Sequence, residues 1–202
     1  MAKGICTKAA VQGIAVMVDA AQSFGHIPVD VKSLDCDILA FSPHKMFGSN
    51  GIGALYAKAG RLDEMQPLLL GGAMVDNVND GDSIWMPYPA KFKAGSQNLA
   101  DALGFAAAVN WNNVTGMVAM HMHVTDVTRY ALDSLLKLND VDIYGPRSAA
   151  QRGVAIRAGH HCCQPLMGNL RIAATASFAP YNNRNDVDAL VESIHAAKVM
   201  MT

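Results

Sequence analysis

Three short apolar runs stand out in the first third of the chain. They cover residues 14–18, 37–41 and 52–56, and polar or glycine-rich segments separate them. Continuous apolar runs of this length are typical of buried strands, and a helix-like stretch at residues 5–12 leads into the first run. The pattern predicts an α/β fold with a mostly parallel sheet that is covered on both faces.

The remainder of the chain predicts a long loop followed by helices and short strands. Residues 70–91 are rich in Gly, Asp, Asn and Pro, whereas Val124, Val127, Ala131 and Leu135 fall on one helical face. Strands are predicted near residues 141–144 and 154–157. A last helix has apolar positions 187, 190, 191 and 194, with Asn185 as its N-cap. We therefore expect a partial large domain over residues 1–113 and a C-terminal α+β small domain over residues 114–202.

Composition excludes several classes of function. The 202 residues have a net charge of -1, 6% aromatic residues and no block of basic residues, so a nucleic-acid surface is not expected. No apolar run approaches the ~18 residues of a membrane span. The N-terminal stretch resembles a signal peptide, but Gln12 interrupts it and Asp19 ends it, so we expect no leader. The four cysteines lack C-x-x-C spacing, which indicates free thiols and a cytoplasmic protein.

Two candidate sites follow predicted strands directly. Asp19, in V-D-A-A-Q (residues 18–22), places a carboxylate at the carboxyl edge of the sheet, where α/β proteins bind ligands. S-P-H-K (residues 42–45) brings a hydroxyl, an imidazole and an amine to the same edge. A lysine such as Lys45 forms a Schiff base with a carbonyl, and Ser42 and His44 can donate hydrogen bonds to a phosphate. Ordinary polar loops are the alternative interpretation of both segments.

A third candidate site is R-A-G-H-H-C-C-Q-P at residues 157–165. A thiol beside His and Arg is in an environment that favours the nucleophilic thiolate. Zinc is the competing interpretation, but consecutive residues rarely converge on one ion, so we predict no metal site. His121 and His123 lie on different faces of a predicted helix and are not expected to bind metal.

Taken in order, V-D-A-A-Q, S-P-H-K, A-G-S-Q-N (residues 94–98) and R-A-G-H-H-C resemble the cysteine desulfurases. These are aminotransferase class V-like, fold-type I enzymes that depend on pyridoxal 5'-phosphate (PLP). The motif R-x-G-H-H-C-x-Q-P in particular resembles the Suf-type desulfurases and the selenocysteine lyases. The resemblance runs from about residue 5 to residue 199. It implies a partial PLP-binding large domain and an incomplete small domain that carries the cysteine loop.

The resemblance implies a role for each matching residue. Lys45 would carry PLP and move protons, and Asp19 would pair with the pyridinium nitrogen. Gln22 would hydrogen-bond the phenolic oxygen of the ring. Ser42 and His44 would hold the phosphate.

The other implied roles concern the substrate and a partner subunit. Ser96 matches a hydroxyl that reaches the phosphate in the partner subunit of a homodimer. Cys162 would attack the sulfur of L-cysteine, leaving L-alanine and a persulfide on the enzyme, and Arg157 would hold the substrate. Sulfur would then pass to an acceptor protein of the Suf system for iron–sulfur cluster assembly.

The chain also departs from the family pattern. It has about half the usual length, and the part of the cradle that normally precedes residue 5 cannot be assigned. Thr175 stands where the family has an arginine that clamps the substrate carboxylate, and Arg171 lies four residues upstream. Cys163 follows Cys162 where the family usually has alanine. The alternatives to a cysteine desulfurase are therefore a non-catalytic fragment or remnant, a selenocysteine lyase acting on L-selenocysteine, or another class V lyase.

Overall fold

The computed structural model describes residues 2–139, 141–144, 157–158, 164–170 and 174–201. The chain divides into two compact units, Met1–Met117 and Val118–Thr202. Sequence predictions for residues 145–156, 159–163 and 171–173 lie outside the described residues.

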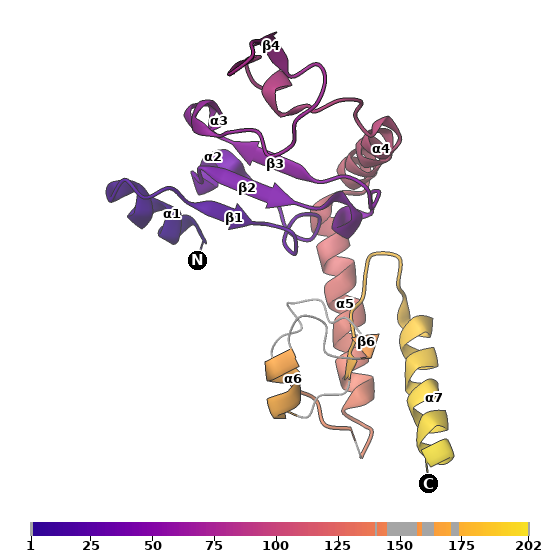
Figure 1. The fold of residues 1–202 in the computed structure, drawn as a ribbon. Helices are drawn as coiled ribbons and strands as arrows, with labels where there is room; N and C mark the ends of the chain where they lie inside the picture. Colours follow the sequence, from indigo (N-terminus) through magenta and orange to yellow (C-terminus); the bar gives the residue numbers. More distant parts are fainter. Residues whose placement is uncertain (1, 140, 145–156, 159–163, 171–173, 202) are drawn as a thin grey trace. The chain divides into compact units, whose positions relative to one another are not determined.

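The elements of the first unit alternate between helix and strand as far as β4; β5, a 3-10 turn and a long helix follow (Figure 1). They are α1 (Ala2–Val11), β1 (Met17–Asp19), α2 (Val31–Leu34), β2 (Ile38–Phe41), η1 (Pro43–Met46), β3 (Ala54–Ala57), α3 (Ala59–Glu64), β4 (Val75–Val78), β5 (Ser83–Trp85), η2 (Ala90–Phe92) and α4 (Leu99–Thr115). The three strands β1, β2 and β3 correspond to the three apolar runs, so those predictions are confirmed.

The central sheet has the order β1-β2-β3. β1 and β2 are parallel, with Asp19 opposite Ala40, and the long connection through α2 makes this possible. β3 runs antiparallel to β2, with Phe41 opposite Ala54, and residues 42–53 connect the two strands. The apolar pattern predicted a mostly parallel sheet, whereas one of the two pairings in the described sheet is antiparallel.

One face of this sheet packs against α1 and α2. The fully buried residues there are Cys6, Ala20, Cys36 and Leu39. Cys6 and Cys36 are free thiols, as predicted. Burial, followed by the neighbouring Cys6 thiol, raises the pKa of Cys36. The opposite face is different, because Met17 is 59% exposed. Leu55 of β3 is 50% exposed on the same face, so the prediction that both faces of the sheet are covered is wrong for β1 and β3 within the described residues.

Asp37 fixes the start of β2 against its neighbours. Its carboxylate accepts a hydrogen bond from the Val16 N–H at 2.9 Å and from Arg61 Nε at 3.3 Å. These donors hold the pKa of Asp37 below its ordinary value, the Val16 N–H contributing most. The contacts join the chain before β1, the start of β2 and α3, and so help to fix the parallel register.

The predicted loop at residues 70–91 contains a β-hairpin, so this prediction is wrong. β4 and β5 pair antiparallel with a register shift between Val75 and Asn77. A turn joins them, in which the Asn79 N–H donates to the Asp82 carbonyl at 2.9 Å. β4 has two adjacent polar residues between its valines, and Val78 and Ile84 are exposed, so the strands lack the regular alternation that usually indicates a half-buried strand.

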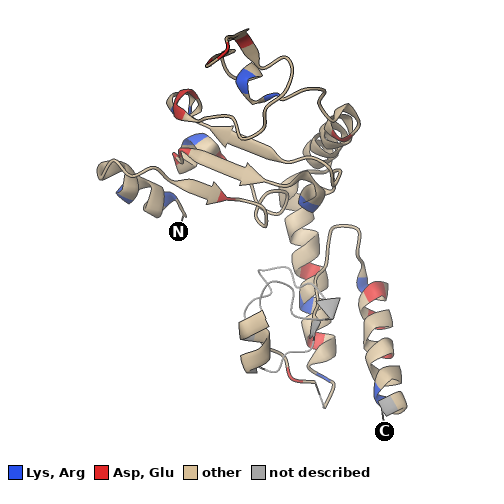
Figure 2. Cartoon of the chain, viewed as in Figure 1, with Lys and Arg blue, Asp and Glu red and all other residues tan. Residues whose placement is uncertain are grey.

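The second unit contains two long helices and three shorter elements. They are α5 (Met117–Leu135), β6 (Arg157–Ala158), α6 (Gln164–Leu170), β7 (Ala174–Thr175) and α7 (Arg184–Met201). Val127 and Ala131 of α5 pack with Phe178 and Val187 of α7 and its preceding segment. This confirms the predicted apolar faces of both helices. Basic residues lie near both ends of α7, and the acidic residues lie between them (Figure 2).

Two details of the second unit differ from prediction. Residues 141–144 form no strand, since the described part of the chain offers them no strand to pair with. α7 begins at Arg184, so the predicted cap Asn185 lies inside the helix. Asn183 caps it instead, because its Oδ1 accepts from the Asn185 N–H at 2.8 Å.

Candidate functional site

Asp19 ends β1 at the carboxyl edge of the sheet. Its Oδ1 accepts a hydrogen bond from the Ala21 N–H at 2.9 Å, while the side chain remains exposed. The next residue, Ala20, is 1% exposed and donates its N–H to the Ala40 carbonyl at 2.8 Å. The carboxylate therefore stands on a backbone that the neighbouring strand holds in place.

Lys45 lies in a single 3-10 turn that follows β2. Two hydrogen bonds close the turn. The Lys45 N–H donates to the Ser42 carbonyl at 3.1 Å, and the Gly48 N–H donates to the Pro43 carbonyl at 2.9 Å. Pro43 and Met46 are buried, whereas Lys45 is half-buried and His44 is exposed. In a 3-10 turn, residues three apart share one face. The turn therefore anchors one face in the protein and leaves the amine and the imidazole accessible.

The segments that carry Asp19 and Lys45 contact each other. β1 and β2 are parallel, so both segments leave the sheet at the same edge. Gly25 has a φ of +84°, and a Cβ there would lie 2.5 Å from Met46 Cβ, next to Lys45. Phe24 stacks on Phe41 with ring centroids 3.7 Å apart. Gln22 is exposed in the same loop, between Asp19 and this contact.

Ser96 is exposed in the loop that leads into α4. Two residues later, Asn98 caps α4 by accepting from the Asp101 N–H at 3.2 Å. The Asn98 amide also donates to the Gly51 carbonyl at 3.2 Å, in the segment between the Lys45 turn and β3. The structure thus ties the loop of Ser96 to the loop that follows Lys45.

The remaining predicted site residues belong to the second unit. Cys162 and Cys163 lie outside the described residues, as does Arg171. Arg157 is the first residue of β6 and pairs with Thr175 of β7. Thr175, where the resemblance implies an arginine that clamps the substrate carboxylate, therefore lies directly opposite Arg157 in this two-stranded sheet.

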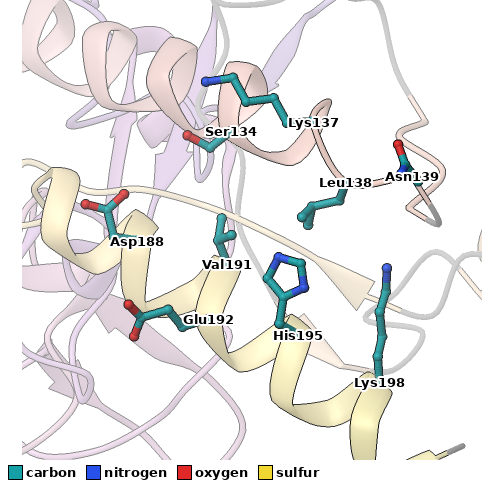
Figure 3. A pocket seen from close by; sticks show the side chains of 9 residues that line it. All are labelled: Ser134, Lys137, Leu138, Asn139, Asp188, Val191, Glu192, His195 and Lys198. Carbon is teal, nitrogen blue, oxygen red and sulfur yellow. The ribbon is translucent and has the colours of Figure 1, made fainter.

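An open cavity of about 680 Å³ occupies the second unit, between the end of α5 and α7 (Figure 3). Its lining is Ser134, Lys137, Leu138, Asn139, Asp188, Val191, Glu192, His195 and Lys198. Side chains of both charges face it, and Asp188 accepts a hydrogen bond from the Tyr130 hydroxyl at 2.7 Å. None of the described catalytic or binding residues predicted from the sequence lines this cavity.

Among the described residues, no three His, Cys, Asp or Glu side chains are grouped as a metal site would require. None of the helices in the described ranges has the length and apolar character needed to cross a membrane. His121 and His123 lie within α5, as predicted, and His123 Nε2 is 2.8 Å from the Asn182 carbonyl oxygen.

Sequence reasoning missed two residues that contact the Lys45 turn. Gly25 approaches it from the loop after β1. Asn112 approaches it from α4, where its side-chain amide donates to the Met46 carbonyl at 3.2 Å. Asn112 lies three and a half turns into α4, seven positions after the packed Phe105. A polar residue in register with an apolar face was the one available signal.

The polar side chains at this edge of the sheet can bind several kinds of chemical group. An amine can bind an aldehyde, a carboxylate can pair with a protonated ring nitrogen, and hydroxyl and imidazole groups can bind a phosphate. Lys45, Asp19, Ser42 and His44 supply these groups at one sheet edge. Within the described part of the chain, the Ser42 hydroxyl makes no bond to the turn that it precedes.

Comparison with known proteins gives consistent results. Residues 2–152 and 147–190 match the aminotransferase class-V family. A cysteine desulfurase of Haloferax volcanii is 43% identical over 210 residues, which cover 92% of this chain and 49% of that protein. The chain thus spans about half the length of the curated relatives it matches.

Two solved structures are similar over nearly the whole chain. The cysteine desulfurase CsdA of Escherichia coli has a TM-score of 0.83 and 36% identity, covering 98% of this chain and 55% of that one. The apo cysteine desulfurase of Thermococcus onnurineus has a TM-score of 0.86 and 30% identity, covering 97% of this chain and 55% of that one.

Proposed function

The chain belongs to the aminotransferase class-V family, and from this premise we propose that it is a PLP-dependent cysteine desulfurase. The likeness to solved desulfurases confirms the predicted fold class, the PLP fold type I. The observation that carries the proposal is the placement of Asp19 and Lys45. They follow two adjacent parallel strands, and the loops that carry them pack together.

The described residues fit PLP by their chemistry. The Lys45 amine would hold the aldehyde carbon of the cofactor, and the Asp19 carboxylate would keep the ring nitrogen protonated. Gly25 supports this fit, since its lack of a side chain lets the Asp19 loop approach the Lys45 turn. When bound, PLP supplies an electron sink for the carbon that carries the substrate amine.

The polar residues around this pair have separate proposed tasks. Ser42 and His44 would donate hydrogen bonds to the phosphate, and Gln22 would donate to the phenolic oxygen. Ser96 is exposed and would reach the phosphate in the partner subunit of a homodimer. Lys45 is half-buried and would move protons at the carbon that carries the substrate amine.

The proposed reaction converts L-cysteine to L-alanine. The C–S bond of the substrate breaks, a S–S bond to the Cys162 thiolate forms, and the substrate carbon takes up a proton. Cys162 thus becomes a persulfide, and thiolate attack on sulfur is a task to which an oxygen nucleophile is poorly suited. Arg157 would hold the substrate near Cys162.

The motif around Cys162 supports a more specific assignment. Residues 157–165 carry R-x-G-H-H-C-x-Q-P, which resembles the Suf-type desulfurases. On this basis the persulfide sulfur passes to a Suf acceptor protein for iron–sulfur cluster assembly in the cytoplasm. The domain assignment, 1–113 for cofactor binding and 114–202 for the cysteine loop, belongs to the same proposal.

The first test is a visible absorption spectrum of the purified chain mixed with PLP. We expect a band that survives desalting in the wild type and is lost in Lys45→Ala. Lys32→Ala is the matched control, because Lys32 is an exposed lysine of the same unit. A band that is equal in wild type and Lys45→Ala would refute the assignment of Lys45.

The second test separates the desulfurase from its alternatives. Added L-cysteine should yield L-alanine and a persulfide that is absent in Cys162→Ala. A band at Lys45 without any alanine would instead support the second candidate, a non-catalytic remnant, for which Thr175 in place of the expected arginine is the supporting observation. Release of selenium from L-selenocysteine with no turnover of L-cysteine would support a selenocysteine lyase.

A further inference from the structure

Asn112 is a buried polar residue in the middle of α4. It is 5% exposed, and its Nδ2 donates to two backbone carbonyls. One is Ala108, one turn earlier in the same helix, at 2.7 Å; the other is Met46, at 3.2 Å. The second bond spans 66 positions of sequence and reaches the residue that follows Lys45.

The orientation of the Asn112 amide is dictated by its partners. Both neighbours are carbonyl oxygens, which only accept, so the NH2 group must face them. Both hydrogens of the NH2 are then used. Oδ1 is left buried, and within the described residues it has no hydrogen-bond partner. A buried acceptor without a hydrogen-bond partner destabilises the fold, so Asn112 lowers the free energy of unfolding through its Oδ1 atom.

The Met46 carbonyl is the point at which α4 holds the Lys45 turn. Gly25 packs against Met46 from the loop after β1, and the Phe47 ring meets the Trp111 ring edge to face at 5.0 Å. Phe47 itself has a φ of 71°, a conformation that non-glycine residues rarely adopt without external support. Groups outside the segment thus hold the turn directly after Lys45, at Met46 and Phe47.

We propose that Asn112 is a positioning residue, whose hydrogen bond to the Met46 carbonyl fixes the turn that presents the Lys45 amine. The bond acts on the backbone next to Lys45 and touches no reacting group. Its effect on the turn stands independently of any cofactor. Its effect on PLP binding rests on the function proposed above.

The test of the turn is hydrogen exchange of the amides of residues 42–48. The N–H groups of Lys45, Phe47 and Gly48 are bonded within the turn and report on its opening. In Asn112→Ala we expect these amides to exchange at least tenfold faster, with no change in β2. Asn113→Ala is the matched control, because Asn113 is an exposed asparagine on the same helix.

A second variant separates the hydrogen bond from packing. Asn112→Leu keeps a similar volume, removes the orphaned acceptor and removes the donor. If the bond positions the turn, Asn112→Leu opens it as Asn112→Ala does, while the melting temperature falls less. Unchanged exchange in Asn112→Leu would overturn the proposal, as would exchange that rises equally throughout the first unit.

The consequence for Lys45 is measured by the rate at which the PLP band forms. We expect at least a tenfold slower rate in both Asn112 variants and the wild-type rate in Asn113→Ala. Wild-type rates in the Asn112 variants would overturn the link to Lys45. A wild-type chain that forms no band would overturn the proposed function alone, and the exchange comparison would still decide the role of Asn112.

Discussion

Replacing Gly25 with alanine should disturb the candidate site more than its small size suggests. Gly25 has a φ of +84°, and an added Cβ would lie 2.5 Å from Met46 Cβ and 2.9 Å from Met46 Cα. The left-handed conformation costs alanine about 1–2 kcal/mol. Carbon atoms pack at about 3.5–4.0 Å, so the turn must also move by about 1 Å.

The size of the effect follows from these two contributions. Overpacking of this kind typically costs about 1–3 kcal/mol, which gives a total of about 2–5 kcal/mol for Gly25→Ala. Gly13→Ala is the matched control, because Gly13 has a φ of +67° and open space around its Cα. Both variants reduce the freedom of the unfolded chain equally, so their difference isolates the contact with Met46.

The assay is urea unfolding followed by circular dichroism, together with the PLP spectrum. Relative to Gly13→Ala, the midpoint of Gly25→Ala should fall by about 1 M, using an m-value of about 1–3 kcal/mol/M. Displacement of the turn should also weaken the PLP band in Gly25→Ala, and leave it intact in Gly13→Ala. Equal midpoints would refute the reasoning, since the Met46 contact would then yield without cost.

Three further predictions concern the framework of the two units. Asp37→Asn should reduce the acid sensitivity of stability. The ionised Asp37 carboxylate contributes stability that is complete above pH 3.8 and is lost as the pH falls through its lowered pKa. Equal pH slopes of the urea midpoint in wild type and variant would contradict this. Lys91→Met should lower the melting temperature, at a cost of about 1–3 kcal/mol, because the buried amine donates to the backbone carbonyl of Asp63 at 3.0 Å; an unchanged temperature would show that the bond contributes nothing. Asn183→Ala should cost about 1 kcal/mol and Asn185→Ala far less in thermal unfolding, and the reverse order would restore the cap predicted from sequence.

The sequence predicted elements best where burial has a regular period. Leu39 in β2 and Val127 in α5 are both buried, and each lies in a run or periodic stripe that indicated its element. The hairpin at β4 and β5 was missed because its short strands, V-D-N-V and S-I-W, show no regular alternation of apolar and polar residues. Its signal was the turn at residues 79–82, where Asn, Asp and Gly cluster.

The candidate site divides in the same way. Asp19 and Lys45 could be predicted because each follows an apolar strand at the carboxyl edge of the sheet. Gly25 and Asn112 could not, because their roles depend on contacts between segments that are distant in sequence. Four asparagines lie in α4 and at its N-cap, and only its register with Phe105 distinguishes the buried Asn112 from its exposed neighbours.

Because β3 runs back alongside β2, the segment that carries Lys45 is a loop whose two ends lie close together. Phe41 is paired with Ala54, so the chain between them begins and ends at adjacent points of the sheet. Doubling the length of such a loop costs only about 0.6 kcal/mol of closure entropy. Chain closure therefore places little restriction on how this segment can vary. The restrictions come from the contacts of Gly25 with Met46, of Asn112 with Met46 and of Asn98 with Gly51. The fold thus tolerates insertions and substitutions between β2 and β3 that leave these three contacts in place, while the proposed function also requires Ser42, His44 and Lys45.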